Sequence, residues 1–262
     1  MRSGKKSKFA TQPFSGKVAL VTGGASGLGR VSAIALARQG ARVALSDVAV
    51  NEGETTARMI TRAGGQAAFV RADVTSSCEV EAMVQETVKT FGRLDFALNN
   101  AGIDGVRART ADYPEEVWHQ VVNINLTGVF LCMKFELPFM VEQGSGVIIN
   151  LSSVAGVTGF PGHAAYTASK HGVIGLTRTA ALDYAKAGIR VNAICPAYTR
   201  TPMLTRMLER TPGLEEKLTA RVPLQRLGTA EEIALAVIYL FSDAAAFITG
   251  HSLVMDGGIV AE

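Results

Sequence analysis

The chain has 262 residues, 48% of them hydrophobic, which is enough for one large α/β domain or two small ones with a sizeable core. Its longest apolar runs, such as 233–241, are far shorter than the roughly 18 residues of a membrane helix, which predicts a soluble protein. Four of its 26 Lys and Arg residues lie in a leading segment without acids, and the remaining 22 face 23 Asp and Glu residues, so no nucleic-acid-binding face is indicated.

Residues 1–14 are predicted to form a flexible basic tail, and residues 15–262 a single domain. The tail has no apolar stretch, which excludes a secretory signal. Cys78, Cys132 and Cys195 contain no Cys-x-x-Cys pattern and the four His residues form no ligand motif, so neither a disulfide framework nor a metal site is indicated. We therefore expect a cytoplasmic protein.

A short buried strand is predicted at Lys17–Thr22, because this run is apolar, rich in β-branched residues and closed by glycines. The glycine-rich turn Thr22–Gly29 leads from it directly into a helical pattern. Glycines at 23, 27 and 29 leave no Cβ in the turn, so a pyrophosphate can approach the backbone amides and the positive end of the helix. A glycine-rich turn alone is weak evidence, but the strand–turn–helix context indicates dinucleotide binding.

Asp47 ends the second predicted strand, at the distance beyond the glycines where such folds place the ribose ligand. A carboxylate there can accept both hydroxyl groups of the adenosine ribose and would repel a 2′-phosphate, which favours NAD over NADP. The alternative is an N-cap role for Asp47 on the following helix, which does not exclude the first role.

The alternation continues along the chain. Helices are predicted at about 50–63, 76–91, 114–141, 163–187 and 230–242, and strands at 66–71, 94–98, 146–152, 189–194 and just before Asp256. Alternating strands and helices with short joints indicate parallel strands connected by right-handed crossovers, and hence one doubly wound sheet. Asp73 follows the third strand, where it either faces an adenine or caps the next helix.

Two further motifs carry polar groups. In Asn99-Asn-Ala-Gly102 the Asn side chains can bond neighbouring backbone, and Gly102 lets the chain pass close to a flat ring. If Tyr166-Thr-Ala-Ser-Lys170 is helical, its phenol and ammonium lie one turn apart on the same face and can address one small molecule. A free tyrosine has a pKa of about 10, so a fixed cation beside it would help it to act as a base near neutrality.

Thr22-Gly-x-x-x-Gly-x-Gly29, Asn99-Asn-Ala-Gly102, Ser153 and Tyr166-x-x-x-Lys170, in this order, resemble the short-chain dehydrogenase/reductase family, in its NAD-preferring form with an Asn-Ser-Tyr-Lys catalytic set. The likeness runs from about Gly16 to Gly258. It implies an α/β fold, a single doubly wound Rossmann domain with a central seven-stranded parallel sheet flanked by helices on both faces.

The resemblance implies four catalytic residues, Asn125, Ser153, Tyr166 and Lys170. Tyr166 would take the proton of an alcohol while hydride passes to the nicotinamide, and Lys170 would lower the pKa of Tyr166 and bond the nicotinamide ribose. Ser153 would orient the substrate oxygen. Asn125 matches the family asparagine better than Asn123; it would hold a water against Lys170, with a satisfied helix-interior amide as the alternative.

The implied cofactor-binding set comprises Gly23, Ser26, Gly27, Leu28, Gly29, Asp47, Val48, Asp73, Val74, Asn100, Ala101, Gly102, Tyr166, Lys170, Pro196, Thr199 and Thr201. After Pro196 the family usually has glycine, and this chain has Ala197. If that position needs a positive φ, the replacement costs about 1 kcal/mol or moves the loop that holds Thr199 and Thr201; otherwise it is harmless.

Residues 201–222 correspond to the substrate lid of the family, with prolines that suit a short helix on hinges. The apolar residues of the lid either pack on the body or contact substrate. The pocket segments 104–112, 154–163 and 198–208 hold few fixed charges, which favours a small or medium neutral secondary alcohol or ketone, although Arg107 and Arg109 could instead receive an acidic group.

The expectation is therefore an NAD-dependent oxidoreductase acting on CH–OH groups. One alternative is a 3-oxoacyl-carrier-protein reductase using NADPH, which Asp47 and Ser26 argue against because NADPH-using relatives usually have a basic residue in place of Ser26 and no acid at Asp47. The other is a non-catalytic nicotinamide-sensing protein, which the intact catalytic set argues against. Helices 114–141 and 163–187 are apolar on more than one face, which together with the resemblance predicts a homotetramer or homodimer with no nucleic-acid or membrane partner.

Overall fold

Seven short apolar segments form one parallel sheet in the computed structural model of the protein, which describes residues 12–261. The strands are β1 (Val18–Thr22), β2 (Arg42–Asp47), β3 (Gln66–Arg71), β4 (Phe96–Asn99), β5 (Gly146–Leu151), β6 (Ile189–Pro196) and β9 (Ser252–Met255). Their order is β3-β2-β1-β4-β5-β6-β9, and every neighbouring pair is parallel. The order reverses direction between β1 and β4, which is the switch point at which such sheets bind ligands.

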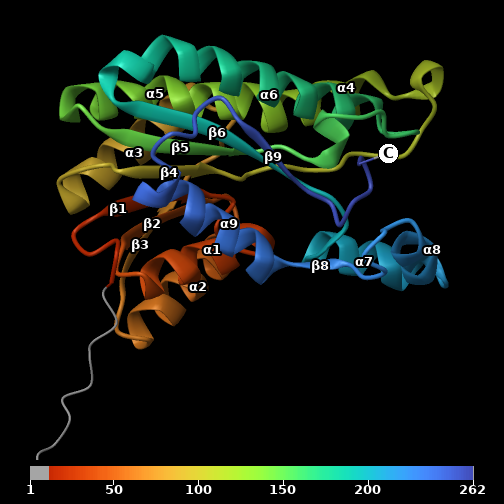
Figure 1. The fold of residues 1–262 in the computed structure, drawn as a ribbon, viewed down its shortest axis with the longest axis horizontal. Helices are drawn as coiled ribbons and strands as arrows, with labels where there is room; N and C mark the ends of the chain where they lie inside the picture. Colours follow the sequence, from red (N-terminus) through yellow and green to blue (C-terminus); the bar gives the residue numbers. More distant parts are fainter. Residues whose placement is uncertain (1–11, 262) are drawn as a thin grey trace, which may run out of the picture.

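Helices cover both faces of the sheet (Figure 1). One face packs α3 (Ser77–Phe91), α4 (Glu115–Val122), α5 (Gly128–Gln143) and α6 (Ala164–Tyr184), and the other packs α1 (Gly27–Arg38), α2 (Val50–Arg62) and α9 (Ala230–Phe241). Each layer has its own apolar core against the sheet. The predicted doubly wound fold, with helices on both faces of a seven-stranded parallel sheet, is confirmed.

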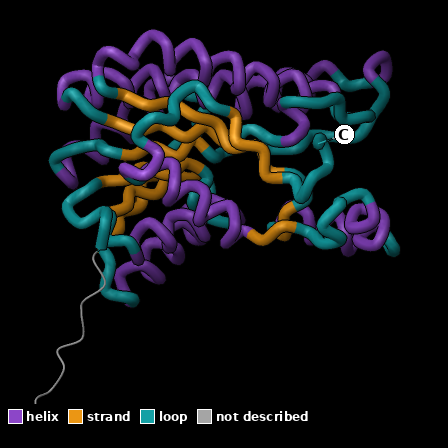
Figure 2. Tube along the Cα trace, viewed as in Figure 1, coloured by secondary structure: helices purple, strands orange, loops and turns teal. Residues whose placement is uncertain are grey.

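A small lobe lies beyond the carboxyl ends of the strands (Figure 2). It consists of α7 (Pro202–Arg210), α8 (Leu214–Ala220) and a two-stranded sheet of β7 (Thr199–Arg200) and β8 (Gly228–Thr229). Leu204, Leu218 and Leu227 form its own small core. The lobe contains the predicted lid segment, but as two helices rather than one, on a strand pair that the sequence pattern did not predict.

The predicted helix 114–141 contains an irregularity. It runs from Glu115 to Gln143, but Asn123–Thr127 form a π-helical turn between α4 and α5. By length and composition alone this helix could cross a membrane, and half of its apolar window is buried inside the structure. Core helices of globular proteins pass the same test. Single π turns occur frequently at functional sites, and this one includes Asn125.

The start of the folded body lies earlier than predicted. Residues 1–11 of the expected tail are outside the described residues, but Phe14, which was assigned to the tail, is buried and packs edge-on against Phe96. An aromatic side chain with so much apolar area is stabilised by this burial. Phe14 therefore belongs to the folded body and not to the tail.

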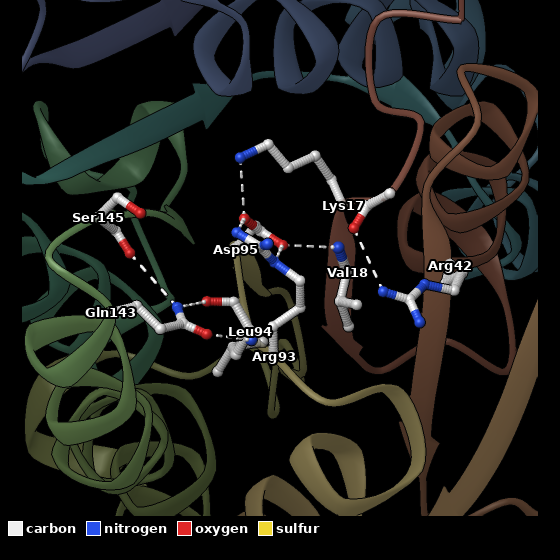
Figure 3. Close-up of polar contacts among 9 residues, drawn as sticks. Lys17, Val18, Arg42, Arg93, Leu94, Asp95, Gln143 and Ser145 are labelled. Atoms are coloured by element: carbon white, nitrogen blue, oxygen red, sulfur yellow. Dashed lines mark hydrogen bonds and ion pairs between the residues drawn. The ribbon is translucent and has the colours of Figure 1, made fainter.

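The amino end of the sheet is fixed by a buried carboxylate (Figure 3). Asp95 accepts hydrogen bonds from Lys17 Nζ at 3.0 Å, Arg93 Nε at 2.7 Å and the Val18 backbone at 2.9 Å. Burial alone would raise the pKa of Asp95, but these donors hold it below its ordinary value. The contacts fix the amino end of β4 against that of β1. The site described next lies at the other, carboxyl ends of the strands.

Candidate active site

The glycine-rich turn after β1 is closely packed. A Cβ at Gly29 would overlap the carbonyl oxygen of Gly23, and Gly23 and Gly27 have φ of +65° and +53°. The side chain of Asn100 donates to the carbonyls of Thr22 at 2.9 Å and Gly23 at 3.2 Å. These bonds join the two predicted cofactor motifs at the switch point of the sheet.

Asp47 lies beside this turn at the end of β2. Its Oδ2 accepts from the backbone N–H of Ala25 at 3.0 Å and its Oδ1 from that of Ala49 at 3.0 Å. The N-cap residue of α2 is Ala49, so the alternative role of Asp47 as an N-cap is wrong. Each carboxylate oxygen retains acceptor capacity for a hydroxyl group. Ser26 and Val48 are exposed beside it.

Asp73 has a structural role in the turn before α3. Its Oδ1 accepts from the backbone N–H and the hydroxyl of Thr75, at 2.9 and 2.8 Å, which is a turn contact, whereas the N-cap residue of α3 is Ser76. Val74 is buried, and a Cβ on Gly128 would lie 2.8 Å from its Cγ2. Both residues lie at the carboxyl end of β3, where the sequence predicts the adenine.

The turn and Asp47 together fit a dinucleotide. The turn leaves backbone amides uncovered by Cβ atoms at the start of α1, where an anion is favoured, and Asp47 stands where a ribose diol would follow. The start of the lid lies close, because a Cβ on Gly27 would be 3.6 Å from Pro202 Cδ.

Asn125 is fully buried in the π turn, whereas Asn123 is exposed. Its Oδ1 accepts from the backbone N–H of Ile103 at 2.8 Å, and its Nδ2 donates to the carbonyl of Ile103 at 2.8 Å and to Ser169 Oγ at 3.3 Å. The amide thus links the loop after β4 to α6. Ile103 and Ser169 are partners that the motif comparison missed.

Gly102 brings three of the predicted residues together. A Cβ on Gly102 would lie 3.2 Å from Asn125 Oδ1 and 3.6 Å from Lys170 Nζ. The motif after β4, the π turn and α6 therefore converge on one point, and a side chain at position 102 would crowd the polar atoms there.

Lys170 is held by the end of β5. Its side chain is only 4% exposed, and Nζ donates to the carbonyl of Leu151 at 2.7 Å. Burial lowers the pKa of Lys170 to about 8. Nζ also lies 5.7 Å from the centre of the Tyr166 ring, as the predicted one-turn spacing requires.

Tyr166 and Ser153 meet at the same point. Burial raises the pKa of the Tyr166 phenol above its ordinary value, and a hydrogen bond with Ser153 opposes this rise. Ser153 Oγ also accepts from the backbone of Ala155 at 3.1 Å. Without the cofactor, burial therefore outweighs the favourable contact of the phenol with Ser153, and the predicted lowering of the Tyr166 pKa by Lys170 and oxidised nicotinamide stays a prediction. Asp104 adds to the rise and is a charged neighbour that motif spacing did not single out.

The loop after β6 carries the last predicted residues. Pro196 is buried, Thr199 Oγ1 donates to the carbonyl of Ala197 at 3.1 Å, and Thr201 caps α7 by accepting from Leu204 N at 3.3 Å. Among the described residues, Gln225 alone combines a side chain with a positive φ, so Ala197 causes no backbone strain. The replacement of the family glycine is therefore harmless.

Comparisons with known proteins agree with this architecture. A family model described as enoyl-(acyl carrier protein) reductase matches residues 23–260. The chain is 45% identical to 2,5-dichloro-2,5-cyclohexadiene-1,4-diol dehydrogenase of Sphingobium indicum, over 94% of this chain and 98% of the relative. It is 39% identical to cyclohexanol dehydrogenase of an Acinetobacter species, over 97% and 99%.

A solved structure is similar throughout. The structure of an NAD⁺-bound xylitol dehydrogenase superposes with a TM-score of 0.91 at 38% identity, over 94% of this chain and 99% of that chain. Fold, motifs and relatives agree over nearly the whole length. The chain belongs to the short-chain dehydrogenase/reductase family and is an oxidoreductase acting on CH–OH groups.

Proposed function

We propose that this oxidoreductase transfers hydride between NAD(H) and a neutral alicyclic secondary alcohol or ketone. Asp47 carries the cofactor assignment, because an anionic side chain beside the glycine turn suits a ribose diol and repels a 2′-phosphate. The NAD⁺-bound state of the xylitol dehydrogenase relative supports the same choice.

The proposed roles follow from the arrangement of side chains. Tyr166 exchanges a proton with the substrate oxygen, and the Ser153 hydroxyl that meets it orients that oxygen. Lys170 supplies a buried cation one turn away, and Asn125 fixes the loop that carries Gly102. Bound NAD would supply the hydride acceptor on its nicotinamide ring and, when oxidised, a positive charge that favours the phenolate.

The ring preference rests on the relatives and on the pocket segments. Two relatives are named for six-membered carbocyclic alcohols. The predicted pocket segments 104–112 and 154–163 lie together, because Ala108 N donates to the carbonyl of Gly162 at 3.0 Å. Phe160 stacks on His163 with ring centres 4.6 Å apart, so this wall presents a flat aromatic surface. A flat aromatic surface suits the face of a six-membered ring.

We also propose residues 201–222 as the substrate lid of a single domain that includes Phe14 near its start. Its first helix lies close to the glycine turn, which suits closure over a bound cofactor. The protein is proposed to be a cytoplasmic homotetramer, or a homodimer, without nucleic-acid or membrane partners. An apolar groove between α5 and α6, lined by Leu126, Phe130, Gly172, Gly175 and Leu176, supports the association.

The 3-oxoacyl-carrier-protein reductase remains the competing enzyme, since the matching family model is named for a reductase of acyl carrier protein substrates. A screen of cyclic and open-chain secondary alcohols with NAD at alkaline pH, followed by NADH absorbance, tests the proposal. We expect the highest kcat/KM with a six-membered ring and at least about a 10-fold preference for NAD over NADP. Equal or better use of NADP would refute the cofactor assignment.

A further inference from the structure

A set of buried polar side chains joins the strands and helices that carry the site. Its members, called here the Glu136 network, are Glu136 of α5, Asn99 of β4, Asn150 of β5 and Thr177 of α6, and all are fully or almost fully buried. Asn99 Nδ2 donates to Glu136 Oε2 at 3.1 Å and to Asn150 Oδ1 at 3.0 Å. Asn150 Nδ2 donates to Thr177 Oγ1 at 3.0 Å.

Each strand member of the network directly precedes a residue of the site. Asn99 is followed by Asn100, which binds the glycine turn. Asn150 is followed by Leu151, whose carbonyl accepts from Lys170. Thr177 lies seven residues, or two helical turns, after Lys170 and therefore on the same face of α6. The network thus connects the cofactor motif after β4 to α6, the helix that carries Lys170.

Glu136 has no positive partner in this environment. Within residues 12–261 it forms no ion pair, and its one titratable neighbour is the buried thiol of Cys132. The buried residues of α3, which packs on α5, are Val80, Met83, Val84 and Thr87, and none of them is charged. A lone buried carboxylate is costly, so the group keeps its proton; burial raises the pKa of Glu136 to about 8.

The unpaired atoms of the network agree with a proton on Glu136. Glu136 Oε1 and Asn99 Oδ1 both lack a hydrogen-bond partner. An ionised Glu136 has only acceptor atoms and leaves Asn99 Oδ1 without a donor, whereas the carboxylic acid adds a donor to the cluster. The uncharged form therefore satisfies the cluster better.

We propose that Glu136 is an uncharged carboxylic acid that acts as a positioning residue, fixing the ends of β4 and β5 relative to α6 and so placing the cofactor motif against Lys170. Its kinetic consequences rest on the proposed function. Its effect on NAD affinity rests on the proposed cofactor alone, and its effect on the pH dependence of stability rests on neither the cofactor nor the reaction.

Four variants test the positioning role. E136Q keeps the shape and lacks the charge, so kcat/KM for NAD is expected to stay within about 3-fold of the wild type. E136L and T177V remove network bonds and are expected to lower it about 10-fold, mostly through KM for NAD. T87V is the matched control, because Thr87 and Thr177 are both buried and both donate to the carbonyl four residues earlier, but Thr87 is outside the network.

The charge state is tested by melting temperature across pH. Because the pKa of Glu136 is raised in the folded protein, the folded state holds more protons than the unfolded state between about pH 4.5 and 8. The contribution of Glu136 to the free energy of unfolding therefore falls as pH rises through that range. E136Q is expected to melt at the same temperature as the wild type below pH 4.5 and progressively higher than it toward pH 8. Lys170 and Tyr166 titrate in both proteins, so the difference isolates Glu136.

The outcomes separate this inference from the proposed function. If no alcohol is oxidised, the proposed function fails, while calorimetric NAD affinity and the melting curves of the same variants still decide the role of Glu136. Wild-type NAD affinity in both E136L and T177V would overturn the positioning role. A melting difference for E136Q that does not change with pH, or a loss of affinity in E136Q equal to that in E136L, would overturn the uncharged state.

Discussion

Burial affects the two reactive side chains of the site in opposite directions. It raises the pKa of Tyr166 and lowers that of Lys170 to about 8, so in both cases the uncharged form gains. The proposed mechanism needs a lowered Tyr166 pKa instead, and the positive charge of bound, oxidised nicotinamide would act in that direction. Proton transfer by Tyr166 is therefore expected to depend on bound NAD.

Lys170 gives the first prediction. Because its folded pKa is depressed, the buried cation lowers stability at pH 7, and the loss disappears as pH rises from about 8 to the unfolded value of 10.5. Lys170→Met is expected to abolish turnover and to raise the free energy of unfolding at pH 7, by an amount on the order of 3 kcal/mol before the lost bond to Leu151 is counted. Urea unfolding at pH 7 and pH 10 measures both values. We expect the gain in free energy of unfolding over the wild type to be larger at pH 7 than at pH 10. A gain that is smaller at pH 7 than at pH 10 would contradict this account.

At the scale of single elements, the sequence predicted the strand–turn–helix at Thr22–Gly29 well, because the glycine positions and the apolar period both act locally. The same local pattern could not reveal the π turn at Asn123–Thr127, which depends on packing between α4, α5 and α6. Side-chain pKa values depend on burial by distant segments. For this reason the sequence predicted the spacing of Tyr166 to Lys170 but not the effect of burial on the Tyr166 pKa.

Asp95 gives a prediction about how β1 and β4 are joined. Removing its carboxylate leaves the buried N–H of Val18 without a partner, while the half-exposed Lys17 and Arg93 can turn to water, so Asp95→Ala is expected to cost about 2 kcal/mol. Its depressed pKa adds stability above the unfolded value near 4, and this contribution is lost as pH falls through the folded pKa. Acid unfolding of the variant is thus expected to depend less on pH than that of the wild type.

The control for Asp95→Ala is an exposed ion pair. Lys89 and Glu86 lie 3.1 Å apart on α3, with both side chains in solvent. Glu86→Gln is expected to change the free energy of unfolding by less than about 0.5 kcal/mol. If urea unfolding gives the same change in free energy of unfolding for both substitutions, Asp95 does not stabilise the contact between β1 and β4.

At the scale of the whole molecule, the doubly wound order explains why site residues as far apart in sequence as Thr22 and Thr201 meet at the carboxyl ends of the strands. That order was predictable from the alternation of elements. The pairing of β7 with β8 was not, because each strand has only two residues and carries no periodic signal. The burial of Phe14 was also missed, since the surrounding basic residues dominate the composition of that segment.

The groove between α5 and α6 leads to a prediction about assembly. Phe130 is 46% exposed at this groove, and burial in a second copy would remove that apolar area from water. The wild type is expected to be a homotetramer by light scattering, and Phe130→Glu is expected to give a smaller species. Met59→Glu is the control, since Met59 is similarly exposed but lies on α2, on the other face of the sheet. A monomeric wild type would refute the proposed assembly.

The central claim, that Tyr166 is the acid and base of an NAD-dependent alcohol oxidation, is tested most directly by Tyr166→Phe. The phenyl ring keeps the packing and removes the hydroxyl that Ser153 meets. We expect kcat for the best alcohol of the screen to fall by at least about 1,000-fold, while NAD still raises the melting temperature as in the wild type. Retained turnover in this variant would contradict the account.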